Sequence, residues 1–164
     1  MEDKTQIYKL DDTTTGAFEY LVEWLYSQHF SKDIDSGDIM AIHAGFKHLI
    51  ELWVLAEKLL IPALQNAVIL EIAARMKSTS ITPTTCLNYV YENTAKDSQL
   101  RRFVVRLCAW ELSHSWLDKY PAQFPKELLI EMVQMLSGSM TEKTRERKGA
   151  EMDQIGYEVA EPEK

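Results

Sequence analysis

One stretch, residues 49–76, constrains the fold more than any other part of the chain. Its first half, Leu49 to Leu60, holds only three polar side chains, those of Glu51, Glu57 and Lys58. Glu51 and Lys58 are seven residues apart, so they share one narrow stripe of a helix with about 3.6 residues per turn. A helix that is apolar on nearly every other side belongs at the centre of a fold.

Ile61-Pro62 interrupts this apolar stretch. Proline removes a backbone donor and disfavours helical geometry at the residue before it, but it is well accepted in the first turn of a helix. Residues 49–76 therefore predict two helices in a tight hairpin, with the second helix starting at Pro62.

Composition and charge limit the classes of protein that remain. The chain has 164 residues and is 46% hydrophobic, which suits one domain, or one domain with an extension. Its net charge of −7 argues against a nucleic-acid partner and against an anionic membrane surface, because both require a basic face. No apolar run approaches the ~18 to 20 residues that span a bilayer, and the polar start Met1-Glu2-Asp3-Lys4 is not a secretory signal. We expect an intracellular protein, cytoplasmic or nuclear.

Shorter patterns predict the other elements of the chain. Gln6–Leu10 alternates like a short strand, and a helix is expected from about Thr15 to Gln28 after a run of capping residues. His29–Lys47, rich in aspartate, serine and glycine, predicts a variable loop, and its acidic residues do not have calcium-loop spacing. Three further helices are expected: at residues 82–93, after a cap at Asp97 or Ser98, and from Pro125 to Gly138.

The helix over residues 15–28 presents two apolar faces. Phe18, Leu21, Val22 and Leu25 form one face, and Tyr20 and Trp24 lie on another. The hairpin can cover one of the two faces, and a partner for the other is not obvious within the chain. Core packing is the first interpretation of the Tyr20–Trp24 pair. A partner-facing surface is the alternative, because tyrosine and tryptophan are favoured at interfaces.

No group of residues in the sequence forms a convincing catalytic or metal-binding set. The four histidines are scattered, no cysteine pair has zinc-site spacing, and no glycine-rich phosphate loop is present. Cys86 and Cys108 fall inside predicted helices, which favours buried reduced thiols, although a disulfide stays open. We expect a protein that is not an enzyme and holds neither a cofactor nor a metal.

Three segments resemble the BTB/POZ domain, especially its fungal members. Leu55–Asn66 is similar to the helical hairpin of that family, while Ile7–Asp12 and Phe18–Ser27 resemble the strand and helix before it. The resemblance covers roughly residues 5–77. Residues 80–138 resemble, by element order and the Thr82-Pro83 start, the helical segment that often follows such a domain. Residues 139–164 are charged and form an expected disordered tail.

The resemblance implies a fold and a function. The expected fold is mainly α: a partial BTB/POZ-like helical cluster with one short N-terminal strand and a helical extension, lacking the family's N-terminal half. The implied function is a protein–protein interaction module that binds itself, another BTB protein or a different partner, with Phe18, Tyr20 and Trp24 as candidate contact residues. The alternative is a substrate adaptor of a cullin-based ubiquitin ligase. Cullin-binding members have a hydrophobic-any-glutamate pattern here, whereas this chain has Phe18-Glu19-Tyr20.

Overall fold

A computed structural model describes residues 13–30 and 38–139, and within those ranges it contains helices and no strand. The α-helices are α1 (Thr15–Ser27), α2 (Ile39–Lys58), α3 (Pro62–Thr79), α4 (Leu87–Asn93), α5 (Gln99–Glu111), α6 (His114–Lys119) and α7 (Lys126–Ser139). Two short 3₁₀ helices, η1 (Thr84–Cys86) and η2 (Pro121–Gln123), lie between them. The mainly α prediction is confirmed. The strand predicted at residues 6–10 and the tail from residue 140 lie outside the described residues.

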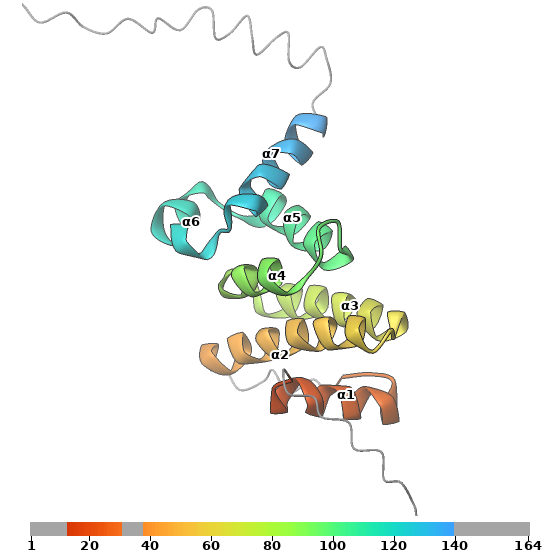
Figure 1. Cartoon of the computed structure of the whole chain (residues 1–164). Coiled ribbons are helices and arrows are strands. Elements are labelled where there is room, and N and C mark those ends of the chain that lie inside the picture. Colours follow the sequence, from red (N-terminus) through yellow and green to blue (C-terminus); the bar gives the residue numbers. More distant parts are fainter. Residues whose placement is uncertain (1–12, 31–37, 140–164) are drawn as a thin grey trace, which may run out of the picture.

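Helix α2 is the centre of the fold. Figure 1 shows α1, α2, α3 and α4 as successive layers, with α5 and α7 beyond them. Helix α2 packs against both α1 and α3, and every residue from Leu49 to Ala56 is buried. Burial on all sides explains why this helix needs so few polar residues.

Helix α2 begins at Ile39, so the predicted loop over residues 29–47 is wrong for its second part. Asp38, read as one more acidic loop residue, is the N-cap, and its side chain accepts a hydrogen bond from the Met40 amide at 2.9 Å. Gly45 suggests a loop but lies within the helix. A Cβ atom at this position would lie 3.1 Å from Nη1 of Arg75, so the small residue makes room for that side chain.

The turn between α2 and α3 has the hydrogen bonds of a Schellman motif. The Ile61 amide donates to the Ala56 carbonyl at 2.9 Å, and the Leu60 amide donates to the Glu57 carbonyl at 3.1 Å. Leu60 has a φ of 56°, in the left-handed region where glycine is usual. Pro62 is the first residue of α3, so the predicted hairpin is confirmed.

Helices α4, α5 and α7 form the C-terminal part of the fold. Ser98, one of the two predicted caps, caps α5 by accepting a hydrogen bond from the Arg101 amide at 3.2 Å. The predicted helix at residues 82–93 begins with η1, and Pro83 stands before it rather than in its first turn. Helix α7 continues through Gly138 to Ser139, so Gly138 does not stop it. Each helix buries a short apolar stripe, such as Leu100, Val104 and Cys108 in α5.

Both cysteines are buried free thiols rather than a disulfide pair. Burial raises the pKa of the Cys108 thiol to about 12, and burial also raises the pKa of Cys86. The expected buried, reduced cysteines are therefore confirmed.

One described helix, α2, is long and apolar enough to cross a membrane, judged by length and composition alone. This length is not predicted from the sequence, because the pattern places residues 39–48 in a loop, whereas the structure places them in α2. The central helix of a water-exposed fold passes the same test, and the packing of α2 between α1 and α3 explains its composition.

Candidate protein-interaction surface on helix α1

The ends of α1 are fixed by local hydrogen bonds. The Thr14 hydroxyl accepts a hydrogen bond from the Ala17 amide at 3.3 Å and donates one to the buried Glu51 carboxylate at 2.5 Å. At the other end, Gln28 adopts a left-handed conformation, and its amide donates to the Trp24 carbonyl. The helix predicted at residues 15–28 is confirmed, and the Thr14–Glu51 bond also ties its start to α2.

The structure determines which side of α1 faces the hairpin. The buried residues of α1 are Ala17, Leu21 and Trp24, whereas the Phe18 and Leu25 side chains are 45% and 53% exposed. Tyr20 and Trp24, for which core packing was the first interpretation, lie on the inward side. Of the face formed by Phe18, Leu21, Val22 and Leu25, only Leu21 packs inward.

Small residues determine which side of α1 meets α2. A Cβ atom at Gly16 would lie 2.4 Å from the His48 ring, and Ala17 is completely buried. Helices approach closely where their side chains are small, so this contact turns the Ala17 side of α1 inward. The prediction considered only large apolar side chains and therefore missed this signal.

Tyr20 is part of a polar network that joins α1 to α3. Its hydroxyl accepts a hydrogen bond from Nη1 of Arg75 in α3 at 2.8 Å, and Nε of Arg75 donates to the Glu71 carboxylate at 2.6 Å. The Arg75 guanidinium also lies over the Tyr20 ring, 5.2 Å from its centroid. The Phe30 ring meets Tyr20 edge-on at 5.9 Å. The Tyr20 side chain therefore stabilises contacts within the fold.

Arg75 is only 5% exposed, and sequence reasoning did not single it out. Burial alone would lower its pKa, but the hydrogen bonds to Glu71 and Tyr20 outweigh that effect and raise it. A signal was present in the sequence. Arg75 continues the apolar stripe of Leu64, Val68 and Ile72 at helical spacing, so a charged residue stood on a buried face.

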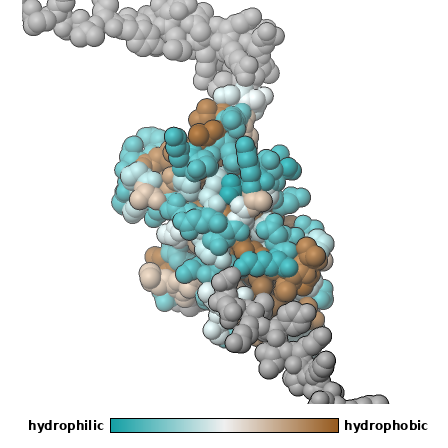
Figure 2. All heavy atoms as spheres, viewed as in Figure 1, coloured by the Kyte–Doolittle hydropathy of each residue, from teal (hydrophilic) through white to brown (hydrophobic). Residues whose placement is uncertain are grey.

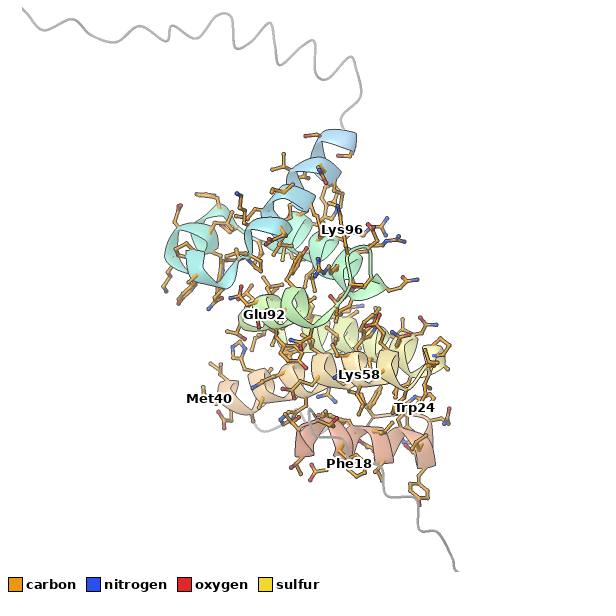
Figure 3. The ribbon with its side chains drawn as sticks, viewed as in Figure 1. Phe18, Trp24, Met40, Lys58, Glu92 and Lys96 are labelled. Atoms are coloured by element: carbon orange, nitrogen blue, oxygen red, sulfur yellow. The ribbon has the colours of Figure 1, made fainter. Side chains whose placement is uncertain are left out.

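The three predicted site residues do not form one surface. Trp24 is buried and Tyr20 is half-buried, whereas Phe18 lies on the side of α1 that faces away from α2 (Figure 3). The outward side instead consists of four exposed apolar or aromatic residues, which we call the outer face: Phe18, Val22, Leu25 and Tyr26.

The outer face has the chemistry of a contact surface. Phe18, Val22 and Leu25 are spaced four and three residues apart, so they form one stripe along the helix. The exposed Glu19 and the half-buried Glu23 stand beside this stripe. An apolar stripe with a charged border can bury area against another protein.

The described residues contain no group of three histidine, cysteine or acidic side chains that could hold a metal ion. The His48 ring lies against Tyr20, with ring centroids 6.4 Å apart.

Comparison of the chain with protein-family models, with curated proteins and with solved structures found no match.

Proposed function

We propose that this chain is a non-catalytic protein-interaction module of the BTB/POZ type, and that its contact surface is the outer face of α1. The observation behind the proposal is that the first helix exposes an apolar stripe although it packs against α2 through its other side. Exposed apolar residues gathered on one face are typical of binding surfaces, whereas single scattered ones need no explanation.

A cullin-adaptor role is the alternative, and one observation favours it. Phe18, the hydrophobic residue of the adaptor pattern, is exposed on the outer face. The position of the glutamate is less favourable, because Tyr20 points inward to Arg75 and offers no carboxylate. Self-association or binding of another protein partner is therefore the proposal that we prefer.

The test replaces two residues of the outer face, Phe18→Ser with Leu25→Ser. Both side chains are about half exposed, so the cost in stability should be about 1 kcal/mol or less. Leu70→Ser with Val133→Ser is the matched control, since these side chains are also exposed but lie on α3 and α7. Tyr20→Ser and Trp24→Ser are unsuitable, because both would disturb interior packing.

Three measurements on the full chain separate the possibilities: sedimentation for self-association, affinity capture from cell extract, and titration with a cullin N-terminal domain. We expect the outer-face variant to weaken association or partner capture at least tenfold, and the control variant to leave it unchanged. Association that persists in the folded outer-face variant would refute the proposed surface. Cullin binding that depends on Phe18 would establish the adaptor role instead.

A further inference from the structure

A second surface, distant in sequence from the outer face, lies where α3, α5 and α7 meet. It is a groove of about 610 Å³, and its apolar lining comes from Ile69, Phe103, Val105 and Met135. Arg102 and Arg106 of α5 also line it. We call it the arginine groove.

Among the described residues, the side chains of Arg102 and Arg106 have no ion-pair partner. Both are exposed, and neither side chain makes an ion pair or hydrogen bond with any residue in the described ranges 13–30 and 38–139. They are four residues apart on one helix, where like charges destabilise the helix slightly. Within the described residues, the groove therefore presents two cations that no carboxylate pairs with.

The other charged residues of the groove are Arg101, Glu131 and Asp97. Arg101 donates to the Tyr91 and Thr94 carbonyls at 2.7 and 2.6 Å, which holds it in a structural role. Glu131 accepts a hydrogen bond from the Tyr91 hydroxyl at 2.5 Å. Asp97 is the other acidic residue of the groove. With three arginines against two carboxylates, the groove favours an anionic, partly apolar occupant.

We propose that residues 149–163 of this same chain occupy the arginine groove. Within this segment the sequence has five acidic residues and no lysine or arginine. Met152, Ile155, Tyr157 and Val159 are interspersed among the acids. The segment therefore combines the negative charge that Arg102 and Arg106 attract with apolar side chains for the lining of the groove.

The connection to α7 puts the segment within reach. Ser139, the last residue that the structure describes, is four residues beyond Met135, which is about 6 Å along a helix. Residues 140–148 can span up to about 30 Å when extended. A short tether gives an effective concentration of about 1 mM, so even a dissociation constant of about 0.1 mM between separate molecules would leave about nine tenths of the chains closed.

The experiment places a nitroxide spin label just beyond the segment in the full chain, through the substitution Lys164→Cys. Cys86 and Cys108 are buried thiols with raised pKa, so the label will react with the introduced cysteine. Nuclear magnetic resonance then measures which backbone amides the label broadens. We expect broadening at Gln99–Arg106 and around Met135.

The decisive variant is Arg102→Gln with Arg106→Gln in the labelled chain. Most of the broadening at α5 should disappear, because the anionic segment loses its cationic partners. Lys119→Gln with Lys126→Gln changes the net charge equally but lies outside the groove, and it should leave the broadening intact. If the arginine variant fails to fold, raising the salt of the parent chain from about 0.05 to about 0.5 M should have the same effect, since salt screens exposed charges.

Three results would overturn the proposal. The first is a lack of broadening at α5. The second is broadening that survives both the arginine substitutions and high salt. The third is broadening that appears only when labelled and unlabelled copies are mixed, which would assign the groove to the segment of a second copy.

Discussion

The two halves of the described chain bury their apolar residues very differently. In residues 13–79, α2 is enclosed by its neighbours and is buried without interruption from Leu49 to Ala56. In residues 84–139, α6 has no buried residue, and α7 buries only Leu128 and Met132. Figure 2 shows that both halves nevertheless expose apolar surface, near the end of α7 and at the α2–α3 turn. Depth of burial, rather than hydrophobic content, should therefore decide the effect of a substitution.

Two tryptophans test this difference most strongly. Trp53 of α2 is 1% exposed, whereas Trp110 of α5 is 69% exposed. Trp53→Ala should cost about 3–5 kcal/mol because it leaves a large cavity. Trp110→Ala should cost about 0.5 kcal/mol or less. Urea unfolding followed by circular dichroism measures both changes.

Equal losses from the two substitutions would contradict the contrast between the halves. A large loss at Trp110 alone would show that its exposed ring is covered in solution, for instance by a second copy. Sedimentation of the Trp110→Ala variant would distinguish that case, because covering by a second copy makes the loss depend on protein concentration.

Alkaline pH should weaken the C-terminal half in particular. Burial raises the pKa of Cys108 to about 12, and burial together with the Glu131 hydrogen bond raises the pKa of Tyr91. A raised folded-state pKa means that the stabilisation is complete below the unfolded-state pKa, near 9 for the thiol, and is lost as the pH rises toward 12. The Cys108 contribution should fall by on the order of 2 kcal/mol between pH 8 and 10.5.

Urea midpoints of the parent chain and of Cys108→Ala, measured at pH 8 and at pH 10.5, check this prediction. The variant should begin somewhat less stable, because it loses a buried sulfur, and then fall less steeply with pH. Parallel decreases in the two proteins would show that Cys108 does not contribute to the alkaline loss.

Features set by local sequence were predictable, and features set by distant partners were not. The start of α1, the hairpin at Pro62 and the Ser98 cap each follow from one or two neighbouring residues, and each was predicted. The start of α2 was not predicted, because Asp38 ends an acidic, glycine-containing run that is typical of a loop.

The candidate site was less predictable than the helices. The rotation of α1 depends on the contact of Gly16 with His48, and the role of Tyr20 depends on Arg75, which is 55 positions away. Periodicity identifies the faces of a helix but not which face meets the neighbour. Phe18 was named as a site residue from the resemblance, and its exposure is a property that only the packed helices reveal.

The smallest expected effect concerns the turn between α2 and α3, where two neighbouring leucines differ in conformation. Leu60 is 85% exposed and has a φ of 56°, whereas Leu59 is helical with a φ of −84°. Leu60→Gly should stabilise the fold by about 0.5–1 kcal/mol, because glycine has no Cβ clash in the left-handed region and little packing is lost. Leu59→Gly, the control, should destabilise it by a similar amount, since glycine is costly in helical geometry. Thermal unfolding of both variants measures the difference in sign, and a loss of stability in Leu60→Gly would mean that the exposed Leu60 side chain is held by contacts in solution.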